Sequence, residues 1–151
     1  MGMKRGQVST ELLIIIGILL LLLVPLLFYS YNRANVAKED IGIQKAEFAA
    51  QRLARLSDSI GYMGGASEIV DEIQLPPYVK SISVDPLTGH DIIINMDSTT
   101  GTKEIVASSA FKINADSFIG QKFQEGDYWV DIKAISYPAN PDYQIMMTLQ
   151  K

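Results

Sequence analysis

The chain has 151 residues, no cysteine, and 13 basic against 17 acidic side chains, a formal net charge of −4. This length allows one small domain beside a membrane segment. The absence of cysteine excludes disulfides and thiolate metal sites, and the negative charge argues against a nucleic-acid partner.

The first feature along the chain is an apolar stretch from Leu12 to Phe28, which contains no polar side chain. A helix of that length covers about 26 Å, close to the thickness of the hydrocarbon core of a bilayer. We therefore predict a transmembrane segment at 12–28. No small-residue cleavage site follows Phe28, so any cleavable leader is expected to precede the apolar stretch.

Charged residues stand directly before this stretch. Lys4 and Arg5 form a basic leader, which by the positive-inside tendency places the N-terminus in the cytoplasm and the rest of the chain outside. Glu11 is the last residue before the apolar side chains begin. A carboxylate at the membrane midplane costs about 2 to 3 kcal/mol and less near a helix end, so a partner for Glu11 is expected. The alternative is an interfacial position favoured by the helix dipole.

The sequence Lys4-Arg5-Gly6-Gln7-Val8-Ser9-Thr10-Glu11, followed by the apolar stretch, resembles the class III signal peptide of archaeal type IV pilin-like proteins. The resemblance implies that a prepilin peptidase cuts between Gly6 and Gln7. It also implies that Gln7, Ser9 and Glu11 serve assembly and register.

Two details refine this resemblance. Ile15 stands where the family pattern favours Leu, a mild departure. An archaellin is matched less well, because mature archaellins usually begin with a Gly-Ile-Gly-Thr-like run that Gln7-Val8-Ser9 does not resemble. The resemblance ends with the apolar stretch.

Beyond Phe28 the pattern indicates that the helix continues, so we predict one long helix over 7–61. Apolar residues recur at helical spacing and form one face of its second half: Ala46, Ala49, Leu53, Leu56 and Ile60. This face is expected to pack on the sheet of the same chain, with Lys45 and Glu47 turned to solvent. Gly61, followed by Gly64 and Gly65, is expected to end the helix.

Two residues weaken the apolar half of the predicted helix. Pro25 lacks an N–H for the carbonyl of Leu21, so a kink or local unwinding is expected there. Gly17 is a second flexible point. Both are candidates for a bend that filament packing uses, although proline kinks are also ordinary in membrane helices.

The remaining residues, 67–151, show short runs of β-forming residues separated by turns. Strands are expected at 70–75, 78–84, 90–96, 103–107, 110–113, 128–135 and 143–149. The turn at 85–89 predicts a hairpin, and 97–102 and 137–142 are expected loops. The pattern is typical of an antiparallel sheet or sandwich. The expected fold class is therefore α+β, with a long N-terminal helix packed on a small antiparallel β-domain.

Motifs for catalysis are missing from the sequence. It contains no nucleophile elbow, no phosphate-binding glycine loop and no His-Glu-x-x-His pair. The single histidine, His90, is expected to be solvated or hydrogen-bonded, and Trp129 is expected in the core. Asp97 to Glu104 is rich in oxygen ligands that suit calcium, but its spacing matches no known cage. We expect no enzyme, no cofactor and no metal site.

These observations combine into one hypothesis with three regions: a signal peptide at 1–6, a long helix at 7–61 and an extracytoplasmic β-rich domain at 67–151. The resemblance implies a pilin-like subunit that is cleaved and then polymerises through its helix into an extracellular adhesive filament. It also implies its partners: the peptidase, an assembly ATPase with its membrane platform, and other subunits. The alternatives are an uncleaved single-pass anchor carrying the β-domain and, less favoured, a tethered enzyme.

Overall fold

A computed structural model describes the backbone of residues 4–98, 101–135 and 144–150, with side chains from Thr10 onward except that of Gln144. The chain divides into two units, Met1–Glu39 and Asp40–Lys151. Helix α1 (Lys4–Met63) begins in the first unit and ends in the second. The long helix predicted at 7–61 is confirmed, and it is slightly longer than expected at both ends.

Within the first unit the helix passes through Gly17 and Pro25 without interruption. The backbone at Pro25 is therefore helical, and a bend there that filament packing uses stays a prediction. A proline removes one hydrogen bond of the helix but leaves its other turns intact, and a long apolar helix tolerates that loss.

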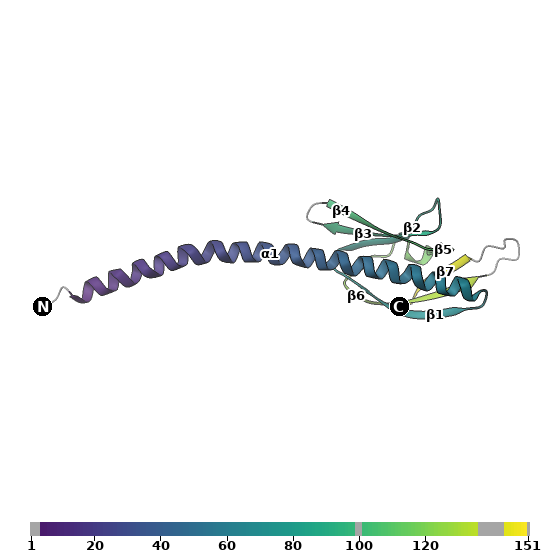
Figure 1. The fold of residues 1–151 in the computed structure, drawn as a ribbon, viewed down its shortest axis with the longest axis horizontal. Coiled ribbons are helices and arrows are strands. Elements are labelled where there is room, and N and C mark those ends of the chain that lie inside the picture. The colour runs from purple at the N-terminus through teal and green to yellow at the C-terminus, as the bar shows by residue number, and fades with distance from the viewer. Residues whose placement is uncertain (1–3, 99–100, 136–143, 151) are drawn as a thin grey trace. The chain divides into compact units, whose positions relative to one another are not determined.

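The second unit contains two β-sheets and the end of α1 (Figure 1). A four-stranded sheet has the order β1-β6-β7-β5, and a three-stranded sheet has the order β2-β3-β4. The strands are β1 (Glu68–Leu75), β2 (Val79–Val84), β3 (Asp91–Ser98), β4 (Gly101–Ser108), β5 (Lys112–Asn114), β6 (Gly126–Ile135) and β7 (Gln144–Gln150), and a short 3-10 helix, η1, covers Asp116–Phe118. The α+β fold class is confirmed.

The core of this unit lies between the helix and the two sheets. Figure 1 draws β2, β3 and β4 on one side of the end of α1 and β1 and β6 on the other. The predicted helix face is buried at Ala46, Ala49, Leu53 and Ile60, while Leu56 is half-buried against the same core. Ala50 and Ala54 are buried as well. Small side chains on this face let the helix backbone approach the sheets closely.

The helix ends differently from the prediction. It continues through Gly61, and Gly64 forms the cap instead, with a φ of 86° and its N–H donated to the carbonyls of Ile60 (3.2 Å) and Gly61 (3.3 Å). Gly61 has another function, since a Cβ added there would stand 2.3 Å from the Phe111 ring. Its missing side chain makes room for that ring.

The strand predictions hold with two corrections. The sheets are antiparallel except for β5 and β7, which pair in parallel. The loop expected at 97–102 is shorter, because β3 extends to Ser98 and β4 begins at Gly101, with Asp97 opposite Thr102. Polar side chains fit there because exposed ends of a hairpin need no apolar face. The loop expected at 137–142 lies outside the described residues.

Candidate functional site

The apolar stretch at 12–28 is the largest exposed hydrophobic surface in the described part of the chain. Its large side chains range from 40% exposed at Leu23 to 72% at Leu21, and none of them is buried. Helix α1 is the one described helix long and apolar enough to cross a membrane, and that stretch lies near the N-terminus. The predicted span at 12–28 therefore coincides with a surface that the described chain leaves uncovered.

The residues of the predicted processing site belong to the start of the same helix. Gly6, Gln7 and Ser9 have helical backbone, while their side chains lie outside the described part. Glu11 follows one helical turn after Gln7 and is exposed. No ion pair joins Glu11 to a side chain of the described residues. A carboxylate therefore stands at the edge of the apolar surface, and no described side chain supplies a cation for it.

An aromatic group marks the other end of the apolar stretch, and the sequence reasoning overlooked it. Phe28, Tyr29 and Tyr31 are exposed within four successive positions of the helix, with Ser30 between the two tyrosines. Arg33 donates a hydrogen bond from Nε to the Tyr29 hydroxyl (3.1 Å) and lies 5.6 Å from the centre of its ring. Aromatic rings and arginine are typical of the boundary between lipid and water. The Phe-Tyr-Ser-Tyr run was the available signal.

Two single-residue expectations have opposite outcomes. His90 is hydrogen-bonded as expected, with Nδ1 3.1 Å from the carbonyl oxygen of Ser109. Trp129 is not in the core: it is 50% exposed, and the expectation was wrong. Strand β6 alternates, so Val130 and Ile132 point inward and Trp129 points to the other face.

The described residues of the oxygen-rich segment from Asp97 to Glu104 belong to the paired strands β3 and β4. Asp97 pairs with Nζ of Lys80 at 3.3 Å and stands opposite Thr102 in the sheet. Across residues 4–98, 101–135 and 144–150, no three acidic, histidine or cysteine side chains gather as metal ligands would.

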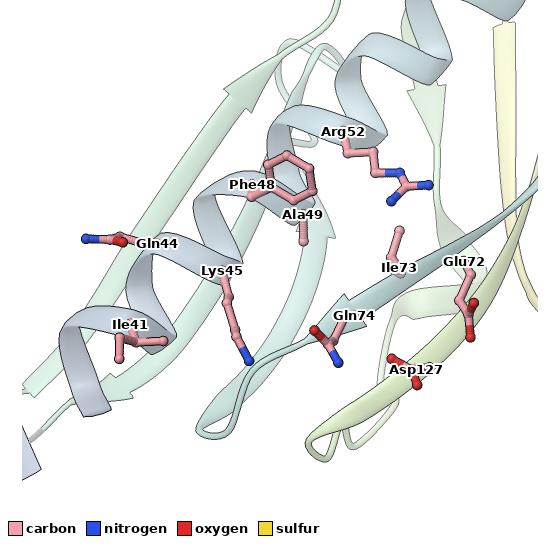
Figure 2. Close-up of a pocket in the computed structure, with 10 residues that line it drawn as sticks. All are labelled: Ile41, Gln44, Lys45, Phe48, Ala49, Arg52, Glu72, Ile73, Gln74 and Asp127. Atoms are coloured by element: carbon pink, nitrogen blue, oxygen red, sulfur yellow. The ribbon is translucent and has the colours of Figure 1, made fainter. Parts of the chain in front are cut away.

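A groove of about 520 Å³ opens between α1 and the four-stranded sheet (Figure 2). Ile41 and Phe48 form its apolar part, and Phe48 is 66% exposed. Lys45 lies between them along the helix, and Arg52 completes that side. Arg52 is held in place by Asp71 through two hydrogen bonds of 2.7 Å. The strands contribute Glu72, Ile73, Gln74 and Asp127.

The predicted turn at 85–89 is confirmed and presents a leucine to solvent. Asp85 accepts hydrogen bonds from the N–H of Leu87 (3.1 Å) and from the hydroxyl of Thr88 (3.0 Å). The N–H of Gly89, at a φ of 69°, bonds to the Asp85 carbonyl at 2.8 Å. The bond from Leu87 holds the pKa of the Asp85 carboxyl below its usual value, and the Thr88 hydroxyl acts in the same direction. Leu87 itself is 93% exposed.

Comparison with known proteins adds no family to this description. No protein-family model matches the chain, and no curated protein matches it.

Proposed function

We propose that this protein is a structural subunit of the type IV pilin kind, which polymerises through its N-terminal helix into an extracellular filament used for surface attachment. The observation that carries the proposal is the exposed apolar surface at 12–28, directly preceded by Glu11 and a basic leader. A signal peptide of this kind places a peptidase cut between Gly6 and Gln7. The leader would then be removed without touching the apolar segment.

The exposed surface requires a cover that the described chain does not supply. Complete burial of one Leu or Ile side chain is worth about 1.5 to 3 kcal/mol, and the stretch contains many of them. A lipid bilayer and a bundle of identical helices satisfy such a surface about equally well. Transfer of a subunit from the membrane into a polymer therefore involves little hydrophobic gain or loss.

Glu11 supplies the interaction that distinguishes the two environments. A cut after Gly6 creates an α-amino group at Gln7, one helical turn before the carboxylate. Each charge alone is penalised in an apolar environment, while an ammonium and a carboxylate together attract strongly there. When the pair forms between neighbouring subunits, it also sets their axial register.

The proposal includes a set of partners and a location. A prepilin peptidase processes the chain, an assembly ATPase with its membrane platform drives polymerisation, and other subunits surround the helix. The N-terminus is cytoplasmic before assembly, with the β-domain outside. The Phe28, Tyr29 and Tyr31 cluster with Arg33 supports a membrane boundary at the end of the apolar stretch. The protein acts by assembly and catalyses no reaction.

Mass spectrometry of membrane and filament fractions tests the proposal. We expect a chain that begins at Gln7, and we expect Gly6→Val to keep the leader because a Cβ at the cut obstructs the extended backbone that a protease binds. Gly17→Val is the matched control, since beyond the adjacent helix backbone no described atom lies within 4 Å of a Cβ placed there. It should be cut normally. An intact chain starting at Met1 or Gly2 would favour the uncleaved membrane anchor.

A further inference from the structure

The exposed turn at 85–89 has the features of a binding knob. Its backbone is held by the three hydrogen bonds to Asp85, and a further bond joins the Thr88 hydroxyl to Asp91 at 3.1 Å. Leu87, at its tip, is more exposed than any other large apolar side chain among the described residues. A preorganised turn loses little conformational entropy when it docks, so an apolar tip on it binds efficiently.

The groove beside α1 has matching chemistry. Ile41 and Phe48 provide exposed apolar surface, and Figure 2 shows them on the helix side of the groove, across from Gln74 and Asp127. Lys45, between them, has no ion pair with a described side chain. The groove is large enough to receive a leucine side chain with its neighbours.

The charged residues of the turn and of the groove favour one orientation of the turn in the groove. Asp85 and Asp91 accompany Leu87 on the turn. Lys45, on the helix side, attracts these carboxylates, whereas Glu72 and Asp127 on the strand side repel them. The acidic residues of the turn therefore face the helix, and the reverse orientation is disfavoured.

The knob and the groove stand at different places along the domain. The carbonyl of Gly89 accepts the N–H of Ile113 at 2.7 Å, and Phe111 packs over Gly61 near the end of α1. Figure 1 shows the β2–β3 turn near β5 at this end. At about 1.5 Å per residue, Phe48 lies about 20 Å back along the helix from Gly61. The knob therefore lies away from the groove of the same copy, so a contact between the two surfaces joins two copies.

We propose that Leu87 of one copy inserts into the groove around Ile41 and Phe48 of a second copy of this chain. In a filament, where each copy has a neighbour on either side, this contact between two different surfaces is heterologous and repeats from copy to copy; two copies that exchanged both contacts would instead close as a two-fold dimer. It rests on the proposed function in that the filament is the assembly that brings the copies together, and it adds a second interface to that of the apolar helices.

Cysteine cross-linking of the full chain tests this contact, and the chain has no cysteine of its own to interfere. Leu87→Cys and Phe48→Cys are made separately and together, expressed in the native cells, and oxidised with a copper–phenanthroline complex. A disulfide forms only when the two Cα atoms approach within about 7 Å. We expect ladders of multimers from the double variant and dimers when the two single variants are co-expressed. Each single variant alone should remain monomeric.

Val106→Cys is the matched control, because Val106 is an exposed apolar residue on β4 outside both surfaces. Co-expressed with Phe48→Cys it should give no dimer above background. Dimers from Leu87→Cys alone would overturn the proposal, because they would show that the turns pair with each other. Absence of the Leu87–Phe48 product from cells with normal filaments would also overturn it.

The outcomes for this contact and for the pilin function are separable. Cleavage at Gln7 and normal filaments without the Leu87–Phe48 disulfide would leave the function standing and remove the contact. The disulfide ladder in membranes of cells that neither cleave the chain nor form filaments would support the contact and remove the function.

A charge change gives an independent measurement. Leu87→Asp should lower the yield of filaments, relative to cleaved subunit, by about tenfold or more, as loss of an interface anchor does. Leu87 is almost fully exposed, so the domain should keep its fold, and Val106→Asp should leave the yield within about twofold. Equal yields for Leu87→Asp and Val106→Asp would contradict the proposed knob.

Discussion

The two halves of helix α1 meet opposite requirements. At 12–28 the side chains are large, apolar and exposed, whereas the half that belongs to the second unit buries mainly alanine, with Leu53 and Ile60. The buried face of the second half finds its apolar contacts within its own chain, while Ile41 and Phe48 beside it stay exposed. The first half needs a lipid or another protein to supply them. One helix thus carries a face that is buried in its own domain and a segment whose apolar side chains are exposed. The buried face has mainly small side chains, and the exposed segment has large ones.

The largest effect is expected at the boundary of the open half. Glu11→Gln should leave membrane insertion and cleavage nearly intact while filament yield falls sharply, because an unpartnered amine would remain in the apolar filament core. Loss of one member of such a buried pair costs about 3 to 5 kcal/mol, so a fall of about a hundredfold or more is expected. Yields of filament and of cleaved subunit are measured in the same cells.

Glu11→Asp provides the control for this variant. It keeps the charge with a reach shorter by one methylene, and its filament yield should be intermediate. Equal losses of cleavage and assembly in Glu11→Gln would show instead that Glu11 serves the peptidase or stability.

The next effect compares the same substitution in the two halves. Leu53→Ala removes a fully buried side chain and should lower the free energy of unfolding of the second unit by about 2 to 5 kcal/mol. Leu20→Ala, in the exposed half, should leave that free energy within about 0.5 kcal/mol. Denaturant titration of the detergent-solubilised chain, followed by Trp129 fluorescence, measures both. Equal destabilisation would show that the halves do not differ in this way.

A smaller loss of stability is expected where the helix ends. Gly61→Ala places a Cβ against Phe111, so the second unit should lose about 1 to 3 kcal/mol of stability through overpacking. Phe111→Leu should relieve part of that loss when combined with Gly61→Ala, which a double-mutant cycle detects. Additive effects of the two substitutions would exclude the contact as the cause.

The smallest effect concerns the outer face of the four-stranded sheet. Burial raises the pKa of Asp131 above its ordinary 3.8, with the charge of Glu68 as a second cause, and Oδ1 of Asp131 has no hydrogen-bond partner among the described residues. A carboxyl whose pKa is raised by folding stabilises the folded state at low pH. That stabilisation is lost as the pH rises through the folded pKa.

Asp131→Asn should therefore raise the free energy of unfolding at pH 7 by less than about 1 kcal/mol, a small gain because water screens the exposed part of the group. The gain should disappear below about pH 4. A gain that persisted at acid pH would assign it to something other than ionisation.

Much of the fold was predictable because it depends on local patterns. The helical spacing of Ala46, Ala49, Leu53 and Ile60 and the Pro-Gly turn after Val84 each specify an element from nearby residues alone. The parallel pairing of β5 with β7 was not predictable, since β5 has three residues and its partner lies some thirty positions away. The need for glycine at position 61 was not predictable either, because it depends on packing against Phe111, which is distant in the sequence.

The features of the candidate site also fall into those that the sequence predicts and those that only the fold brings together. The apolar stretch and Glu11 are contiguous in sequence, so composition and order were enough to predict them. The groove was not predictable, because α1, β1 and β6 each contribute to it. Trp129 was a different kind of error. Its residue type suggested burial, while the alternation of Val130 and Ile132 already indicated that it faces outward.

Two contacts between the helix and the sheets determine how the domain would bear a load. Arg52 forms an ion pair with Asp71 on β1. Oδ1 of Asp58 accepts hydrogen bonds from the Ser109 hydroxyl and the Ala110 N–H, just after the end of β4, each at 2.7 Å. A pull along the helix axis would load both attachments, because each joins the helix to a different part of the β-domain. In a fibre under tension, force arriving through the helix would be shared by both sheets.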